Sequence, residues 1–368
     1  MTVTDRATPP RTRRPPIERS TVEGAVAKLV ARRGLPTGVR PMAWTAVPID
    51  PLDPIDAFTA ARSLGVEAAL WLQPSVGRSI FGLGRAWAVD AAGPDRFAEA
   101  AAAWRAILAD AEGGPDAVGG GPVLLGGLGF TGNPPVGGDP WTAFGAASLV
   151  LPTFTVATDA GGAVLTIALA PGRDEDPDPG EVDAAWDDIV RATERTPAAT
   201  QPSARRGTIR LSEQRPDRAV WERTVGQFAG AVGRGRIDKV VLARRVALDS
   251  DEELDVAAAL RHLARTAPES TTFAFERDGT TFLGATPERL VRTRGRAFET
   301  VAIAGSAPRG HDATEDASLA AALLASEKER EEHAVVVDTL RANLAPIVES
   351  LEVAATPGAA DKVMVMLD

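Results

Sequence analysis

The chain has 368 residues, 44% apolar and 24% charged, a composition typical of a globular protein with a sizeable core. Its net charge of -10 argues against nucleic acid as a partner, and the absence of cysteine excludes disulfides, a thiol nucleophile and a cysteine-ligated metal. No apolar run is long enough to cross a membrane and no secretory signal is present, so we expect a cytoplasmic protein. With three histidines, a divalent ion would depend on carboxylates, which suits magnesium.

The first half of the chain predicts a sheet with helices. Residues 1–20 are rich in arginine, proline and threonine and predict a disordered leader. Glycine and proline turns separate one predicted helix, at 97–108, from predicted strands at 68–72, 86–89, 122–125, 147–152, 154–157 and 163–168. A low-complexity stretch at 197–206 marks a boundary. We therefore expect an N-terminal subdomain at 21–200 and a second domain at 212–368.

The second half shows helix and hairpin signals. Asp217 can cap a helix that Gly233 ends, and a further helix is predicted at 254–264. Turns at Asp278-Gly279 and Arg294-Gly295 predict two successive hairpins, which together form an antiparallel meander. The fold class that follows is α+β, with antiparallel sheets flanked by helices.

Lys239 begins a run that predicts a strand. Period-2 alternation places Val240, Leu242, Val246 and Leu248 on one face, interpreted as the core face. Lys239 falls on the other face beside small side chains, where a ligand has room. A partly desolvated lysine can act as a general base near neutral pH. The alternative is an edge-strand lysine that extends to water.

Two turns carry further candidates. Glu288 follows the tight turn at Pro287, and a carboxyl group held at a strand end near a pocket can serve as a general acid. The alternative is a solvated turn glutamate. In the turn at 302–310, backbone N–H groups near Gly305 could hold a polar ligand, although alone this would be an ordinary loop.

The last long helix is predicted to begin near Ser326. An apolar stripe runs from His333 to Leu351 with alternating steps of four and three residues. Glu329 and Glu332 lie three residues apart on one side and can form half of a carboxylate site for a hard cation. The alternative is an acidic first turn that the helix dipole favours.

Taken together, these segments resemble the chorismate-utilising enzymes, and within that family the isochorismate synthases. The matching motifs are Lys-Val-Val-Leu-Ala-Arg at 239–244, Gly-Ala-Thr-Pro-Glu-Arg-Leu at 284–290, Ala-Gly-Ser at 304–306 with Pro-Arg-Gly at 308–310, and Leu-Leu-Ala-Ser-Glu-Lys-Glu-Arg-Glu-Glu-His at 323–333. They occur in the order of the family and at its approximate spacing.

The resemblance implies conversion of chorismate to isochorismate. Lys239 would be the general base that activates water for attack on C2, and Glu288 the general acid that protonates the departing C4 hydroxyl. Glu332, with Glu329 near it, would hold Mg²⁺ bound to the ring carboxylate of the substrate. The resemblance also implies that Ala304, Gly305 and Ser306 line the pocket for the substrate ring.

Variation within the family favours water as the nucleophile. Ammonia-using members carry glutamine where Lys239 stands, and aminodeoxychorismate synthase has a lysine at the place of Ala304. We therefore expect that the chain has no glutamine amidotransferase subunit as a partner. We also expect the chain to be a monomer. Salicylate synthase, which goes on to eliminate pyruvate, is the alternative. Whether the product feeds menaquinone or siderophore biosynthesis stays open.

Family members continue beyond the position of Asp368, so the resemblance implies a C-terminally truncated chain. The segments expected to be missing grip the substrate carboxylates and complete the magnesium site. Their loss should remove positioning energy and leave open sheet edges and exposed core. A catalytically inactive remnant is therefore a second hypothesis.

Overall fold

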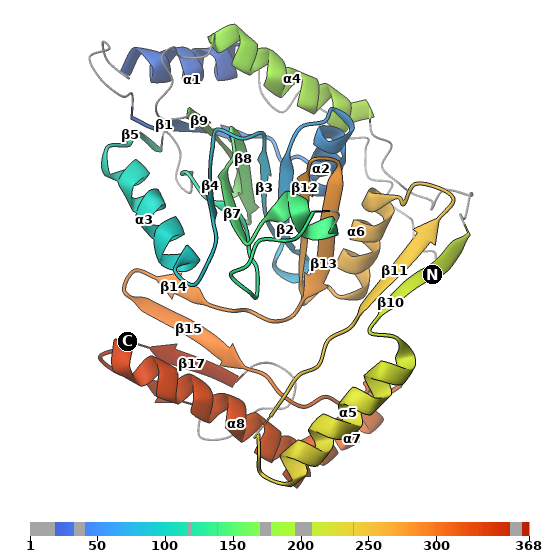
Figure 1. Cartoon of the computed structure of the whole chain (residues 1–368). Coiled ribbons are helices and arrows are strands. Elements are labelled where there is room, and N and C mark those ends of the chain that lie inside the picture. Colours follow the sequence, from blue (N-terminus) through green and yellow to red (C-terminus); the bar gives the residue numbers. More distant parts are fainter. Residues whose placement is uncertain are drawn as a thin grey trace, which may run out of the picture. The chain divides into compact units, whose positions relative to one another are not determined.

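The computed structural model describes residues 19–32, 41–115, 120–137, 139–169, 178–195, 208–237, 239–353 and 363–367. The chain divides into two compact units (Figure 1). The first comprises Met1–Ala204 and Asp255–Thr286, and the second comprises Arg205–Leu254 and Pro287–Asp368. None of the helices in the described ranges has the length and apolar character needed to cross a membrane.

An eight-stranded sheet is the centre of the first unit. Its strand order is β13-β12-β2-β3-β8-β9-β1-β5, and all neighbours are antiparallel except β1 and β5. The strands are β1 (Ala43–Ile49), β2 (Ala68–Gln73), β3 (Arg78–Leu83), β5 (Glu112–Pro115), β8 (Phe154–Asp159), β9 (Gly162–Leu169), β12 (Thr271–Arg277) and β13 (Thr280–Thr286). The α+β prediction is confirmed.

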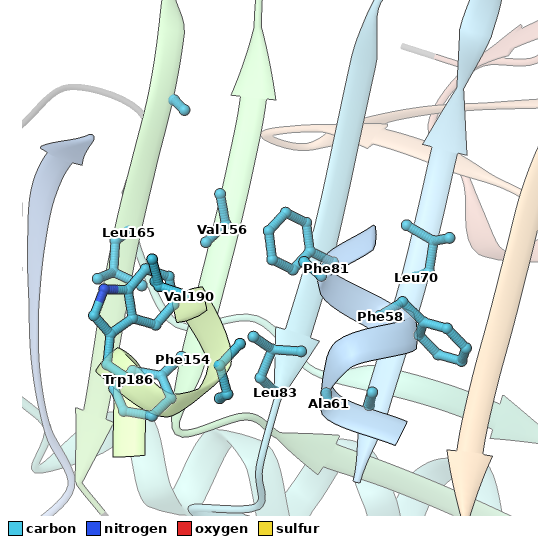
Figure 2. Close-up of a cluster of buried hydrophobic side chains, with 14 of the residues drawn as sticks. Phe58, Ala61, Leu70, Phe81, Leu83, Phe154, Val156, Leu165, Trp186 and Val190 are labelled. Carbon is cyan, nitrogen blue, oxygen red and sulfur yellow. The ribbon is translucent and has the colours of Figure 1, made fainter. Parts of the chain in front are cut away.

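Helices α2 (Pro54–Ser63) and α4 (Pro179–Arg195) cover one face of this sheet (Figure 2). Helix α4 presents Val182, Trp186, Ile189 and Val190 at helical spacing, and all four are buried. The main core therefore lies between these helices and the inward residues of the strands. Helix α1 (Arg19–Arg32) packs on α4, and α6 (Val256–Thr266) packs on α2, β12 and β13.

The opposite face of the sheet carries a smaller cluster. Successive strand residues point to opposite faces, so Ile167 belongs to the main core and Ala168 to this second cluster. Trp87 and Trp104 pack on it with ring centroids 6.4 Å apart. The elements here are β4 (Trp87–Ala91), β6 (Leu125–Leu128) and β7 (Ala147–Leu151), which form a three-stranded sheet, with α3 (Arg96–Ala109) packed on β4 and β7. Two short 3-10 helices, η1 (Pro74–Val76) and η2 (Pro140–Phe144), lie before β3 and β7 in the chain.

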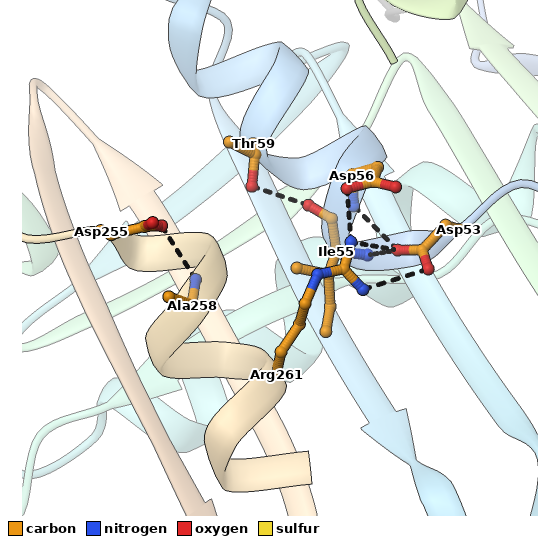
Figure 3. A network of polar contacts seen from close by, with 7 residues as sticks. All are labelled: Asp53, Ile55, Asp56, Thr59, Asp255, Ala258 and Arg261. Carbon is orange, nitrogen blue, oxygen red and sulfur yellow. Dashed lines mark hydrogen bonds and ion pairs between the residues drawn. The ribbon is translucent and has the colours of Figure 1, made fainter. Parts of the chain in front are cut away.

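Polar contacts join α2 to α6 (Figure 3). The Asp53 carboxylate caps α2 by accepting the N–H groups of Ile55 and Asp56, at 3.0 and 2.9 Å. Arg261 of α6 reaches the same carboxylate at 3.3 Å and also pairs with Asp56. One helix start is therefore fixed by local capping and by a residue 208 positions later in the chain.

The described residues of the second unit form two small sheets. Strands β10 (Ile209–Arg215) and β11 (Arg245–Ser250) form an antiparallel pair, and α5 (Arg218–Gly233) lies between them in sequence. The other sheet has the order β14-β15-β17-β16, with β14 (Arg292–Arg294), β15 (Ala297–Ala302), β16 (Glu352–Val353) and β17 (Val363–Leu367). Two further helices follow β15, α7 (Ala313–Ala325) and α8 (Glu327–Leu344), and η3 (Ala345–Ile347) ends the run.

Several sequence expectations differ from the structure. The strand predicted from Lys239 begins only at Arg245. The two hairpins lie in different sheets and do not form one meander. Most of the expected leader, 1–18, lies outside the described residues, as does the stretch 197–206. The segment 255–286, placed by sequence in the second domain, pairs with β2 of the first unit.

Candidate active site

Lys239 lies in an irregular segment between α5 and β11. Its ammonium Nζ lies 3.0 Å from Oε1 of Glu332 on α8, and the two side chains are 26% and 37% exposed. The ammonium group of Lys239 favours the ionised form of the Glu332 carboxyl group. The ion pair therefore fixes Lys239 on the first half of α8, although the strand that was expected to hold it is absent.

The Glu332 carboxyl group stays ionised at lower pH than an ordinary glutamate. Its pKa is lowered, first by the hydrogen bond from Lys239 and further by the charges of Lys239 and Lys328, while burial opposes the shift. A carboxylate with these neighbours is suited to holding a cation and not to donating a proton.

Ser326 sets the position of both acidic residues. Its backbone N–H ends α7 by donating to the carbonyl groups of Ala322 and Leu323, and its hydroxyl accepts the N–H of Glu329 at 3.4 Å. The same residue therefore ends one helix and starts the next. Glu329 lies in the first turn of α8 and Glu332 three residues later, as predicted.

The loop after β15 contacts the same turns of α8. Nε2 of His333 lies 3.3 Å from the Ala302 carbonyl oxygen. Gly305 has a φ of +85°, and a Cβ atom there would lie 2.8 Å from Oε2 of Glu329. Ala304 and Gly305 are half-buried and Ser306 is exposed. The structure thus brings Lys239, Glu329, Glu332 and the predicted ring-pocket loop together in the second unit.

Glu288 lies in the segment between β13 and β14 and is exposed. The segment is fixed by its neighbours: Arg289 forms an ion pair with Glu299 of β15, and the Thr300 hydroxyl donates to the Leu290 carbonyl at 2.7 Å. Sequence reasoning missed these anchors and the contact of His333. Opposite charges on the two strands of a predicted hairpin were an available signal. The role of Glu288 as an acid stays a prediction.

The two expected magnesium ligands have the right chemistry, but two are too few to hold the ion. Carboxylate oxygens are what Mg²⁺ prefers, yet Glu329 already accepts Lys328 Nζ at 2.8 Å and Glu332 accepts Lys239. Within the described parts of the chain, no group of three or more His, Cys, Asp or Glu residues is placed to hold a metal. Glu329 and Glu332 therefore do not by themselves make a metal site.

Comparison with solved structures identifies the class of fold. The chain superposes on MenF, the menaquinone-specific isochorismate synthase of Escherichia coli, with a TM-score of 0.64 and 20% identity. The match covers 94% of this chain and 73% of that one. The sequence pattern of the family described as chorismate binding enzyme matches residues 37–364, so the chain belongs to the chorismate binding enzymes. The predicted family resemblance is confirmed.

Two curated relatives are isochorismate synthases. The salicylate biosynthesis isochorismate synthase of Pseudomonas aeruginosa is 36% identical over 313 residues, which are 84% of this chain and 63% of the relative. Isochorismate synthase DhbC of Bacillus subtilis is 37% identical over 149 residues, 39% of this chain and 37% of the relative. The chain therefore spans less than two thirds of the length of either.

Proposed function

We propose that this chain carries the activity of an isochorismate synthase. The observation that carries the proposal is the 3.0 Å contact between Lys239 Nζ and Glu332 Oε1, beside the loop of Gly305. This contact joins two of the sequence motifs, and Glu329 of the second motif also lies next to Gly305 of a third. The relative from Pseudomonas aeruginosa, which is named an isochorismate synthase, supports the proposal, because its alignment covers 84% of this chain.

The proposed chemistry needs one base and one acid. Lys239 accepts a proton from a water molecule whose oxygen bonds to C2 of the ring. The two ring double bonds each move by one position, and Glu288 gives a proton to the C4 hydroxyl, which leaves as water. One water enters and one leaves, so the reaction requires no oxidant and no covalent intermediate.

Magnesium is part of the proposal. The residues that would hold the ion are Glu329 and Glu332, and Ala304, Gly305 and Ser306 would border the ring. When bound, the metal would supply positive charge for a substrate carboxylate. Both glutamates now contact lysine ammonium groups, so a divalent ion must displace Lys239 and Lys328 from them.

Product analysis with chorismate and MgCl₂ tests the proposal. We expect the chain to form isochorismate, and Lys239→Ala to reduce the rate by roughly 10²–10⁴-fold, the usual contribution of a general base. Lys28→Ala removes an exposed lysine of α1 and serves as the matched control. Glutamine or ammonium salts should change neither rate nor product, because water is the proposed nucleophile.

Each other outcome has a definite meaning. Salicylate and pyruvate in equal amounts would assign the chain to the salicylate synthase alternative. Turnover by Lys239→Ala at the rate of Lys28→Ala would contradict the role of Lys239. Failure of the unaltered chain to consume chorismate would contradict the proposed activity and favour the inactive remnant.

A further inference from the structure

A cavity of about 470 Å³ lies within the first unit, and none of its lining residues belongs to the candidate active site. It is bordered by the residues after α2, the turn between β3 and β4, the start of β8, the end of β9 and one face of α4. Its volume is within the range of small-molecule sites, roughly 300–1,000 Å³.

The floor of the cavity is apolar and firmly packed. Phe154, Leu169 and Ile189 contribute to it and are at most 3% exposed. Figure 2 shows Phe154 next to Trp186 of α4. The ring centroids of the two residues lie 5.3 Å apart. Because these side chains are part of the core, the floor is already formed before any ligand arrives.

The rim is acidic. Glu181 and Asp188 border the cavity from exposed positions two turns apart on α4, and neither forms an ion pair with any residue in the described ranges. Arg85 also borders the cavity, but its guanidinium group binds Glu67 with two hydrogen bonds of 2.6 and 3.0 Å. Among the described residues, Arg85 is therefore already paired with Glu67, whereas Glu181 and Asp188 are not paired with a cation.

We propose that this cavity binds a small organic cation that has an apolar body and one ammonium group. The apolar floor would bury the body, and Glu181 and Asp188 would attract the ammonium. The same two carboxylates repel anions, so the cavity is not suited to a second molecule of a dicarboxylate substrate. The site stands apart from the proposed activity and does not depend on it.

Three probes of one shape and different charge test the proposal: 2-phenylethylammonium, neutral 2-phenylethanol and anionic 3-phenylpropionate. Isothermal titration of the full chain at neutral pH should show tightest binding of the cation and weakest binding of the anion. Glu181→Gln and Asp188→Asn should each weaken binding of the cation by roughly two- to five-fold, as for an exposed ion pair, and leave the alcohol unchanged. Glu194→Gln, an exposed acid of α4 that does not line the cavity, is the control.

A second kind of variant tests the cavity itself. Ala185 lines it from an exposed position on α4, so Ala185→Phe should fill it and abolish binding of the cation and the alcohol. Circular dichroism verifies that this variant folds. The proposal is overturned by equal affinity for all three probes, by absence of binding at millimolar concentration, or by cation binding that survives in the double variant E181Q/D188N.

Discussion

At the scale of single residues, Gly305 meets two geometric demands at once. Its φ of +85° is one that residues other than glycine rarely adopt, and a Cβ atom there would lie 2.8 Å from Oε2 of Glu329, so that the carboxylate would have to shift. We expect Gly305→Ala to lower the free energy of unfolding by about 1–3 kcal/mol, the cost of such backbone strain. Urea denaturation followed by circular dichroism measures it.

Gly226→Ala is the matched control. Gly226 lies in α5, without a positive φ and with no other heavy atom within 4 Å of the added Cβ. Alanine there should raise the free energy of unfolding by about 0.5–1 kcal/mol, because it favours the helix. If both substitutions shift the urea midpoint equally, the steric account of Gly305 is wrong.

A pH dependence follows from Glu332. Its pKa is lowered by Lys239 below the ordinary value of 4.5, so the folded chain holds this proton less tightly than the unfolded chain. The stabilisation of the fold by the ion pair between Glu332 and Lys239 is therefore fully present above pH 4.5. It is lost as the pH falls through the lowered pKa of Glu332. We expect Glu332→Gln to reduce the urea midpoint at pH 7 and to have a smaller effect near pH 3.

The neighbouring Glu331 supplies the comparison for this measurement. It is exposed, and no ion pair to it is found among the residues that the structure describes. Glu331→Gln should therefore change the midpoint little at either pH. A Glu332→Gln difference that stays constant from pH 7 to pH 3 would show that the ion pair with Lys239 does not stabilise the fold.

At the scale of elements, Arg277 connects β12 to two other parts of the first unit. Its side chain is 6% exposed, pairs with Glu67 at 2.8 Å and donates to the hydroxyl group of Ser148 on β7. Burial lowers the pKa of Arg277, and the charge of Glu67 opposes this only in part. We expect Arg277→Met to lower the free energy of unfolding by about 3 kcal/mol, because the half-buried Glu67 carboxylate loses its buried partner.

The expected loss of about 3 kcal/mol is at the low end of the range for breaking a buried ion pair. The reason is that Glu67 still pairs with Arg85 when Arg277 is replaced. Arg85→Met is the control: that side chain is 45% exposed, so its loss should cost less than about 1 kcal/mol. Thermal and urea unfolding of both variants measure the difference. Equal losses would mean that the burial of Arg277 contributes nothing to stability.

Elements specified by local chemistry were predicted from the sequence. Asp278 and Gly279 both have positive φ, as the Asp-Gly turn between β12 and β13 requires. The side chains of Asp217 and Ser326 cap α5 and α8 at the predicted positions. Each of these features depends on a few consecutive residues, so a single sequence contains the necessary signal.

Elements that need a distant partner were predicted less well. The alternating run from Lys239 has the residue pattern of a strand, but β10 pairs only with Arg245–Ser250. The residues 239–244 are not part of a strand, and Val241 among them is 82% exposed. The apolar stripe of α8 continues to Leu351, yet the helix ends at Leu344, two residues before Pro346, which cannot donate an N–H group. Periodicity predicts which residues share a face, but not what covers that face.

At the scale of the whole molecule, the two units differ in how much apolar surface they bury. Among the residues that the structure describes, nearly all buried apolar ones belong to the first unit, including those of the segment 255–286, whose strand β12 pairs with β2. That pairing joins residues about 200 positions apart, for example Phe273 with Trp71, which no local pattern could predict. The candidate site residues belong to the second unit.

The second unit should therefore be the less stable one. Within its described residues, Ala302 is the one buried apolar side chain, whereas Leu248 and Leu290 are 61% and 86% exposed. Apolar burial is the main favourable term in folding, so local opening should cost less there. We expect amide protons of α5 and α8 to exchange with deuterium faster than those of β3 and β8, and limited proteolysis to cut first within 205–254 or 287–353.

This difference in stability also concerns the candidate site. If the second unit opens readily, the contact between Lys239 and Glu332 is broken in a fraction of molecules, and ligands that bind only the closed form should slow exchange in α8. Chorismate with Mg²⁺ is the direct test, and the exchange of β3 should not change. Equal protection of both units without ligand would instead require that the second unit is held by contacts beyond those of its described residues.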